Sequence, residues 1–542
     1  MDFVLKARID EFSYPRGAIP AVHSIDLMLH RQDFVAVVGP AGAGKTTLCH
    51  CLAGVIPHFV RGTYRGSVKV GGRNLSEMTL PEIAPLVGFV LQRPENQLLN
   101  LTVEEDVAFG PENLCMDPVA IRSRVAESLA FVGMSNFAKR APDTLSGGEA
   151  QRVVLSSVLA MGPELFVLDQ PAAELDPVGR KLVYANLCRL NREGGKTILL
   201  VEDRLDDVLP FLTRVILMIE GRIVKDAPPE EFFADETLPS YGIRVPALTS
   251  RTEDCGLRTE WDLERGDTVT RRHGEDSERR TRNAEPVLMP SAHHSSLIAH
   301  HPSQPSVLGP QSCYAVEAQG LGFRYPSSDR WALKSVSLGF RQGEFAAIIG
   351  GNGAGKTTLA KQLAGLLRPT EGGVLVSGRD ISGASVSALS RTVRYLFQDP
   401  DYQLFCNSVF DEAAFSLKIA KVPPKQITEL VDAILQKLGL FSLKDRHPYT
   451  LSRGQRQRLA LASILVREPR VLVVDEPTTS LDYRETIQIL DLLVEYRREG
   501  GTVIMITHDM EMVFRYSERS IVMADGMVDL DTPTAELTPA YL

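Results

Sequence analysis

The sequence predicts two tandem α/β domains, each with a mainly parallel sheet, a glycine-rich loop and a smaller helical subdomain. The loop pattern G-x-x-x-x-G-K-T occurs twice, in GPAGAGKTTL at 39–48 and GGNGAGKTTL at 350–359. Short apolar runs such as FVAVV and FAAII precede the loops and are typical of strands buried on both faces. The segments IRSRVAESLAFVGM and ITELVDAILQKLGL have the apolar period of amphipathic helices. A chain of 542 residues is long enough for two large domains.

Further matching segments indicate that whole domains, and not only single motifs, are duplicated. LSGGEAQRVVL at 145–155 matches LSRGQRQRLAL at 451–461, and LDQPAAELD at 168–176 matches VDEPTTSLD at 474–482. The loop lysines are 311 residues apart, whereas the later pairs, from Gln92 onward, are 306 apart. The difference falls in the segment IPHFVRGTYRG of the first copy.

The predicted boundaries are 1–244 for the first domain, 245–312 for a linker and 313–542 for the second domain. The linker has mixed charge and is then rich in Pro, Ser and His, without a sustained apolar period. Such a composition buries too little apolar surface to offset the entropy of ordering, so we predict a flexible spacer. Its doubled histidines, at 293–294 and 300–301, leave metal binding open as an alternative.

The composition excludes several classes of protein. No apolar run approaches the ~18 residues that a membrane span needs. The start MDFVLKARIDEF lacks a basic segment followed by an apolar block, so we expect the chain to stay in the cytoplasm. Seven cysteines without a CxxC pair predict neither a disulfide framework nor a zinc site. The net charge of -9 argues against a nucleic-acid partner.

The glycine-rich loops predict two nucleotide sites. Their glycines let backbone N–H groups approach phosphate oxygens, and the helix that follows presents its positive end. Lys45 and Lys356 are expected to reach the β and γ phosphates of ATP, and Thr46 and Thr357 to hold Mg²⁺. The expected ATP contacts of the loops are Gly39, Gly42, Gly44, Lys45, Thr46 and Thr47 in the first copy and Gly350, Asn352, Gly353, Gly355, Lys356, Thr357 and Thr358 in the second.

Acidic residues at two strand ends complete the predicted magnesium sites. Asp169 closes the apolar run LFVLD, and Asp475 closes VLVVD. A buried carboxylate without a positive partner is costly, so residue type and position both fit a metal ligand.

The segments LSGGE and LSRGQ predict capped helix starts. Ser146 and Ser452 are the expected N-caps, with Glu149 and Gln455 completing capping boxes. A capped helix start also attracts anions, so these segments are further candidates for phosphate binding. The candidate contacts are Ser146, Gly147, Gly148, Ser452 and Gly454.

The ordered set of motifs resembles the ATP-binding cassette of ABC transporters. Besides the glycine-rich loop, this set comprises a glutamine after a strand, the LSGG signature, an Asp-Glu pair at a strand end, an SLD loop and the sequence ITHD. In that family two cassettes close head to tail, so each ATP lies between the loop of one and the signature of the other. The resemblance implies that Tyr14 and Tyr325 stack on adenine, with core packing as the alternative. It also implies that Gln92 and Gln398 touch Mg²⁺ and the attacking water.

The two copies differ at the positions that this family uses for hydrolysis. The resemblance implies that Glu476 polarises the attacking water and that His508 contacts the γ-phosphate. The first copy has Gln170 in place of Glu476, and Glu202 lies at the 306-residue offset from His508. In the second copy's signature, Arg453 replaces a glycine.

Head-to-tail pairing within the chain would gather Gln170, Glu202 and Arg453 around one ATP. We therefore expect the first site to bind ATP and hold the interface shut, while the second site hydrolyses. The catalytic residues are then Glu476, His508 and Gln398. The alternative is that Gln170 still orients water well enough for hydrolysis.

The segments after each glutamine resemble those of ATPases from energy-coupling factor (ECF) importers in their fused two-cassette form. They read PENQLLNLTVEEDVAFGPENL and PDYQLFCNSVFDEAAFSL, with GVIPHF in the first copy. The resemblance implies a place at the cytoplasmic face of the membrane, with two partners: a transmembrane coupling subunit and a small substrate-binding membrane subunit. The cargo would be a vitamin, a vitamin precursor or a transition-metal ion. Leu98, Leu99, Leu404 and Phe405 are expected to flank a groove for coupling helices, unless they are ordinary core residues.

A ribosome-associated ABC-F translation factor is the alternative function. Those proteins also carry tandem cassettes without membrane spans, but their linker is long, charged and helical. The linker of this chain contains Pro, Ser and His runs, and the net charge of -9 gives little attraction to RNA. DNA-repair ABC ATPases usually interrupt the cassette with coiled coils or zinc modules, and neither is visible. We therefore expect an importer ATPase, whose cargo the sequence does not specify.

Overall fold

A computed structural model describes residues 3–246 and 314–538, apart from 16, 18, 174, 327–329 and 480. Nearly all of the predicted linker, with its doubled histidines, lies outside these described residues. We call 3–246 the first copy and 314–538 the second copy, and both belong to one compact unit.

The first copy is built on a six-stranded sheet in the order β10-β9-β3-β8-β7-β6, parallel except for the edge strand β10. Strands β3, β7 and β8 are buried along their whole length, as expected for the middle of a sheet covered on both faces. The strands are β3 (Phe34–Val38), β6 (Val87–Val90), β7 (Leu165–Asp169), β8 (Thr197–Val201), β9 (Arg214–Ile219) and β10 (Arg222–Ala227).

A second, antiparallel sheet of four strands accompanies the first, in the order β2-β1-β4-β5. This sheet was not predicted from the sequence. Its longest strand alternates buried and exposed residues, because one face packs on the core and the other does not. The strands are β1 (Phe3–Ser13), β2 (Val22–His30), β4 (Thr63–Val70) and β5 (Arg73–Asn74).

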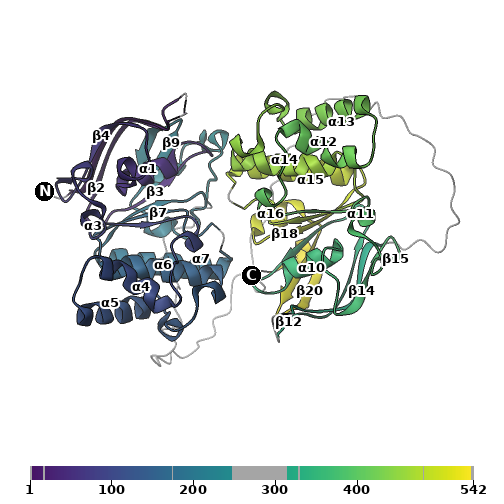
Figure 1. The fold of residues 1–542 in the computed structure, drawn as a ribbon, viewed down its shortest axis with the longest axis horizontal. Helices are drawn as coiled ribbons and strands as arrows, with labels where there is room; N and C mark the ends of the chain where they lie inside the picture. The colour runs from purple at the N-terminus through teal and green to yellow at the C-terminus, as the bar shows by residue number, and fades with distance from the viewer. Residues whose placement is uncertain are drawn as a thin grey trace, which may run out of the picture. The chain divides into compact units, whose positions relative to one another are not determined.

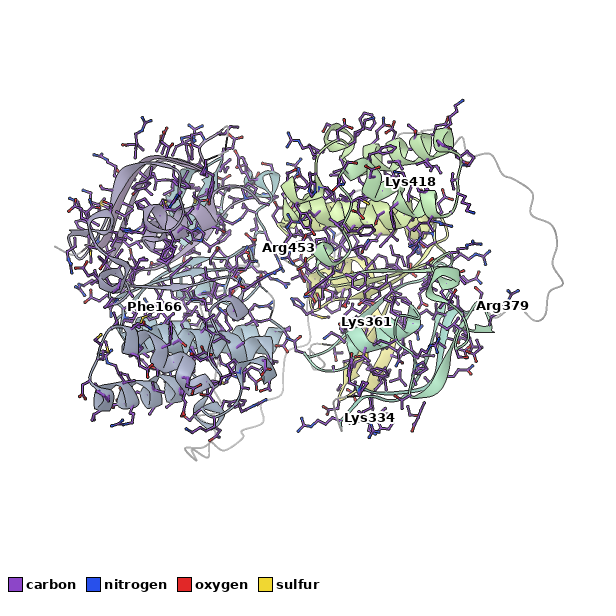
Figure 2. All side chains as sticks on the ribbon, in the orientation of Figure 1. Phe166, Lys334, Lys361, Arg379, Lys418 and Arg453 are labelled. Atoms are coloured by element: carbon purple, nitrogen blue, oxygen red, sulfur yellow. The ribbon has the colours of Figure 1, made fainter. Side chains whose placement is uncertain are left out.

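The helices of the first copy lie on the two faces of the six-stranded sheet (Figure 1). Helix α1 packs between this sheet and the antiparallel sheet, and α4 to α7 cover the opposite face. Phe166 in β7 is fully buried and belongs to the core on the α4–α7 side (Figure 2). The helices are α1 (Lys45–Leu52), α2 (Val55–His58), α3 (Leu80–Ile83), α4 (Val103–Asn113), α5 (Pro118–Phe131), α6 (Gly147–Met161), α7 (Pro177–Arg192) and α8 (Pro229–Phe233).

The second copy repeats this architecture, with sheets β16-β17-β18-β13-β19-β20 and β12-β11-β14-β15. Its strands are β11 (Tyr314–Arg324), β12 (Trp331–Arg341), β13 (Phe345–Ile349), β14 (Glu371–Val376), β15 (Arg379–Asp380), β16 (Val393–Leu396), β17 (Val471–Asp475), β18 (Thr502–Ile506), β19 (Arg519–Ala524) and β20 (Met527–Pro533). Its helices are α10 (Lys356–Leu363), α11 (Val386–Leu389), α12 (Val409–Ile419), α13 (Pro424–Lys437), α14 (Arg453–Leu465), α15 (Tyr483–Arg498) and α16 (Met510–Tyr516).

The fold confirms the predicted class of two tandem α/β domains with helical subdomains. The two helices expected from apolar periodicity are α5 and α13. Within the described residues, no helix is both long and apolar enough to cross a bilayer.

Candidate functional site

Each glycine-rich loop connects the central strand of its sheet to a helix. In both copies the helix is preceded by a glycine in the left-handed region, Gly44 at φ 93° and Gly355 at φ 96°. A Cβ on Gly44 would lie 2.4 Å from the carbonyl oxygen of Ala21, and one on Gly355 would lie 2.5 Å from that of Ala332. Only glycine fits this turn, which leaves the first backbone N–H groups of the helix free to face an anion.

The loop lysines fold back over their own loops. Lys356 Nζ donates to the carbonyl oxygens of Gly350 at 2.8 Å and Gly351 at 2.9 Å. Lys45 Nζ donates to the carbonyl oxygens of Gly39 and Pro40. Burial lowers the pKa of Lys356, and the charge of Glu476 opposes that shift. Both ammonium groups are therefore held at the loop where phosphates are expected.

The strand-end aspartates meet the threonines predicted to share a metal with them. Asp475 accepts from Thr357 Oγ1 at 3.4 Å, and Asp169 is hydrogen-bonded to Thr46. Burial raises the pKa of both carboxyls. A carboxylate and a hydroxyl are the hard oxygen donors that Mg²⁺ prefers, so these residues fit the ion.

Tyr395 supports Asp475 in the second copy only. Its hydroxyl donates to Asp475 Oδ2 at 2.6 Å, and the equivalent residue in the first copy is Phe89. We expect Tyr395→Phe to lower the free energy of unfolding by roughly 1–3 kcal/mol, because one oxygen of a buried carboxylate loses its donor. Urea unfolding measures this. Phe89→Tyr is the control, since no described donor is lost there; equal effects of the two changes would contradict the prediction.

The two predicted adenine contacts occupy matching places. The hydroxyl groups of Tyr14 and Tyr325 lie 3.1 Å from Thr47 Oγ1 and Thr358 Oγ1. The two residues are 39% and 40% exposed, so neither tyrosine is a core residue. Both rings are therefore open to a ligand beside the glycine-rich loop.

The predicted glutamines follow strands β6 and β16. Gln92 and Gln398 come two residues after these strands end. Each strand pairs in parallel with the strand whose end carries Asp169 or Asp475. Glutamine and aspartate thus emerge at the same edge of the sheet in each copy.

The structure confirms the capping boxes at the starts of α6 and α14. Ser146 N donates to Glu149 Oε2 at 2.7 Å, and Ser452 N donates to Gln455 Oε1 at 2.9 Å. In both copies the serine hydroxyl accepts the reciprocal bond from the backbone. Arg453 lies at the start of α14 (Figure 2).

The two signatures face different neighbours. A Cβ on Gly454 would lie 2.1 Å from Glu485 Oε1, so the Glu485 carboxylate lies directly against this glycine. In the first copy, Gly148 faces Gly179, the residue equivalent to Glu485. Sequence reasoning missed Glu485, although its alignment with a glycine at the 306-residue offset was visible.

In the second copy two of the three predicted catalytic residues, Glu476 and His508, lie in contact. His508 Nδ1 lies 3.0 Å from Glu476 Oε1, and Thr479 Oγ1 lies 3.5 Å from Glu476 Oε2. Glu476 has a positive φ of 46°, a conformation that most side chains avoid and that turns the residue sharply away from β17. A carboxylate held beside an imidazole can position and polarise a water molecule.

In the first copy a different pair occupies this place. Gln170 Nε2 donates to Asp203 Oδ2 at 2.6 Å, and Asp203 Oδ1 lies 3.2 Å from Lys45 Nζ. Gln170 has the same backbone turn, with φ 49°. The second copy has its carboxylate at the strand end, on Glu476, whereas the first copy has it on the facing residue, Asp203.

The alignment of Glu202 with His508 is wrong by one residue, and Asp203 is the true equivalent. Val37 pairs with Val201, whereas Ile348, 311 residues after Val37, pairs with Ile506. The offset at these strands is thus 305, and His508 corresponds to Asp203.

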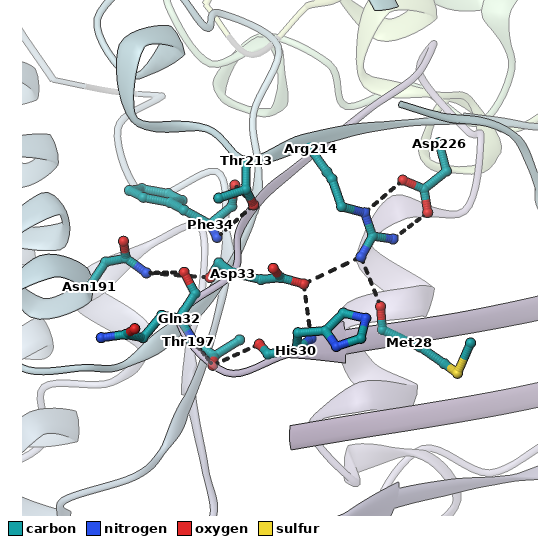
Figure 3. Close-up of polar contacts among 10 residues, drawn as sticks. All are labelled: Met28, His30, Gln32, Asp33, Phe34, Asn191, Thr197, Thr213, Arg214 and Asp226. Carbon is teal, nitrogen blue, oxygen red and sulfur yellow. Dashed lines mark hydrogen bonds and ion pairs between the residues drawn. The ribbon is translucent and has the colours of Figure 1, made fainter. Parts of the chain in front are cut away.

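Hydrogen bonds at the start of β8 establish this register independently. Thr197 Oγ1 accepts from Gln32 N at 3.0 Å and donates to His30 O at 3.2 Å (Figure 3). Thr502 makes the same two contacts with Gly343 and Arg341 in the second copy. The first copy has one additional residue, Lys196, between its Gly-Gly pair and β8, and the turn absorbs it.

Glu202 points into the protein interior. It is 4% exposed, and its Oε2 accepts from the hydroxyl of Tyr184 at 3.0 Å. Burial raises its pKa to about 7, and the charge of Asp203 adds to the shift. Asp203, and not Glu202, is therefore the carboxylate beside the loop lysine.

Several contacts join the two copies. Ala41 N in the first loop donates to Asp482 Oδ2 at 2.9 Å, and Asn352 N in the second loop donates to Asp176 Oδ2 at 3.0 Å. Arg204 also pairs with Asp509 at 2.7 Å. Each copy thus offers the aspartate of its SLD-type loop to the glycine-rich loop of the other, as head-to-tail pairing requires.

Each copy also has a surface groove beside its helical subdomain. Leu99, 71% exposed, lines the groove of the first copy with Phe109 and Met161. Phe405, 61% exposed, lines the groove of the second copy with Phe415.

Two of the four residues predicted for these grooves lie elsewhere. Leu404 is 2% exposed and belongs to the core, and Leu98 packs against the core of its copy. The backbone explains the division. Asp106 accepts from Leu99 N at 2.8 Å, and Glu412 accepts from Phe405 N at 2.8 Å, so each turn directs its second apolar residue outward.

Together these features define a P-loop ATPase with two nucleotide sites. The sequence profile described as ABC transporter matches residues 22–173 and 333–479. The chain belongs to the ABC transporter family, as an ATP-binding protein that uses ATP with Mg²⁺.

Relatives share this family description over nearly the whole chain. A protein of Methanosarcina acetivorans described as an ABC transporter ATP-binding protein is 40% identical over 97% of this chain and 85% of its own length. One of Methanosarcina mazei with the same description is also 40% identical, over 97% of this chain and 88% of its own. The solved structure of cbiO1 from Clostridium perfringens, described as part of the ABC transporter complex cbiONQ, is 37% identical. The match covers 42% of this chain and 90% of the cbiO1 chain, with a TM-score of 0.39.

Proposed function

We propose that this chain is the ATPase subunit that powers an ECF-type importer, with hydrolysis confined to the second nucleotide site. The observation that carries the division of labour is the pair at each strand end. Glu476 with His508 offers a carboxylate base at 3.0 Å from an imidazole, whereas Gln170 with Asp203 offers an amide in place of that base. The first site then binds nucleotide without efficient hydrolysis.

Pairing of the two copies within one chain is part of this proposal. The loop-to-aspartate bonds at 2.9 and 3.0 Å are reciprocal, which is what a head-to-tail arrangement with two shared sites needs. The site residues predicted from the sequence take their roles in this scheme, with Asp203 in place of Glu202. The domain boundaries 1–244, 245–312 and 313–542 are proposed with it.

The two apolar grooves support the proposal of a membrane partner. Each presents an outward apolar side chain whose turn is fixed by a carboxylate from the neighbouring helix, α4 or α12. An exposed Leu or Phe in a groove is suited to an amphipathic helix from a partner. We assign these grooves to the transmembrane coupling subunit, which places the chain at the cytoplasmic face of the membrane. A small substrate-binding membrane subunit completes the proposed complex.

We expect Leu99→Glu combined with Phe405→Glu to abolish association with membrane subunits, because two charges would have to be buried at the docking site. The measurement is affinity purification from detergent-solubilised membranes, with the co-purifying small integral membrane proteins identified by mass spectrometry. Leu101→Glu combined with Tyr402→Glu is the matched control, since these residues are 83% and 85% exposed and are not among the groove residues described above.

The control variant should retain the membrane subunits that the wild type retains. Unchanged melting temperatures would show that both variants fold. Equal retention by the groove variant would remove the grooves from the proposal. Recovery of the wild type with ribosomes, and not with membrane proteins, would favour the translation-factor alternative.

A further inference from the structure

The first nucleotide site has the carboxylate of Asp203 where the second site has the imidazole of His508, whereas the second site has its carboxylate, Glu476, at the strand end. Asp203 lies at the position of His508, with its carboxylate 3.2 Å from Lys45 Nζ. Both lysines donate to two backbone carbonyl oxygens of their own loops, but among the described residues no carboxylate forms an ion pair with Lys356. The loop lysine of the first site is therefore paired directly with a carboxylate, whereas Glu476 acts on the loop lysine of the second site through its charge without such a pair.

The opposite wall of the first site, at the second copy's signature, carries charges of both signs, because Arg453 and Glu485 stand where the first copy has two glycines. Glu485 lies against Gly454 of the second copy's signature, where the first copy has Gly179. One Glu485 oxygen is buried without a hydrogen-bond partner among the described residues. Burial raises the pKa of Glu485, and the charge of Asp203 contributes, so the two carboxylates lie within each other's field.

We propose that Asp203 makes the first site selective for a nucleoside diphosphate over the corresponding triphosphate. A γ-phosphate brings further negative charge and competes with Asp203 for Lys45. Charges a few ångströms apart in a partly buried site repel strongly enough to change affinity by an order of magnitude or more. A diphosphate places less charge beside Asp203.

This inference rests on the proposed function only in that both copies bind nucleotide. It changes one expectation from the sequence, because the first site then retains ADP in preference to ATP. Selectivity for a diphosphate at the first site would also separate the roles of the two sites. The first site would hold a spent nucleotide, while the second would exchange and hydrolyse ATP.

The test measures nucleotide affinity in the full chain carrying Lys356→Ala and Glu476→Gln, which confines binding to the first site and prevents turnover. Isothermal titration with MgATP and with MgADP gives the two dissociation constants. We expect MgADP to bind about 10-fold or more tightly than MgATP. Adding Asp203→Asn should reduce this ratio by about 10-fold or more, because the asparagine keeps the size of the side chain and its acceptor for Gln170 but loses the charge.

Asp206→Asn is the matched control, since it removes the same charge from the same loop, where the carboxylate lies 3.7 Å from Arg244. This change should leave the ratio as it is in the parent. Reciprocally, His508→Asp in a Lys45→Ala and Glu476→Gln background should shift the second site toward MgADP.

A parent protein that binds MgATP as tightly as MgADP would overturn the proposal. So would an Asp203→Asn variant with an unchanged ratio, or equal changes from Asp203→Asn and Asp206→Asn. None of these outcomes depends on hydrolysis or on membrane partners, so the proposed function would stand or fall separately.

Discussion

Replacing Glu476 with glutamine is expected to lower the ATPase rate by about 10²- to 10⁴-fold, the usual loss when a general base is removed. An amide cannot accept a proton near neutral pH. The change keeps the shape of the side chain and its place beside His508, so nucleotide binding should survive. Steady-state phosphate release under saturating MgATP measures the rate, and equilibrium nucleotide binding confirms that the site is intact.

Gln170→Ala is the control in the other site. Because Gln170 occupies the same backbone position without a carboxylate, its removal should change the rate less than about 3-fold, far below the loss expected for a general base. Comparable losses from the two variants would show that both sites hydrolyse and would contradict the division of labour.

Glu202→Gln is expected to remove a pH dependence from stability. The pKa of Glu202 is raised by burial from 4.5 to about 7, so between these values the folded protein binds the proton more tightly than the unfolded chain. The contribution of Glu202 to the free energy of unfolding is thus fully present below pH 4.5 and is lost as the pH rises through 7. The difference between the two pKa values corresponds to about 3 kcal/mol in the free energy of unfolding.

The neutral amide avoids this loss, because its nitrogen can donate to the hydroxyl oxygen of Tyr184. We therefore expect the variant to gain about 3 kcal/mol over the wild type near pH 8 and little near pH 4. Urea unfolding across this range measures the difference. Glu429→Gln is the control, since Glu429 is exposed on α13. A wild type and Glu202→Gln variant with parallel pH profiles would contradict the assignment.

The sequence carried enough information for the site motifs because their residue types are tied to local chemistry. Both glycine-rich loops, both strand-end aspartates and both capping boxes occur where their spacing predicts. The central strands were predictable because β3 and β13 are apolar throughout. Each of these signals lies within about ten consecutive residues.

Features that depend on pairing between distant segments were harder to predict. Strand β1 alternates in burial, but nothing in its own residues says that β4 will be its partner, so the antiparallel sheet was missed. The position of Asp203 needed the hydrogen bonds of Thr197 to show that Lys196 is accommodated in the turn. The buried Leu98 and the exposed Leu99 could be distinguished only from the structure, in which Asp106 accepts a hydrogen bond from Leu99 N.

Asp176 and Asp482 each use one carboxylate oxygen within their own copy and one across the junction. The inner oxygens accept from Gly179 N and Glu485 N, both at 2.7 Å, at the starts of α7 and α15. If the halves part, only the outer bond is lost, at about 1 kcal/mol each, and both helices keep their first turns. Separation of the copies at these two aspartates therefore requires no unfolding at the starts of α7 and α15.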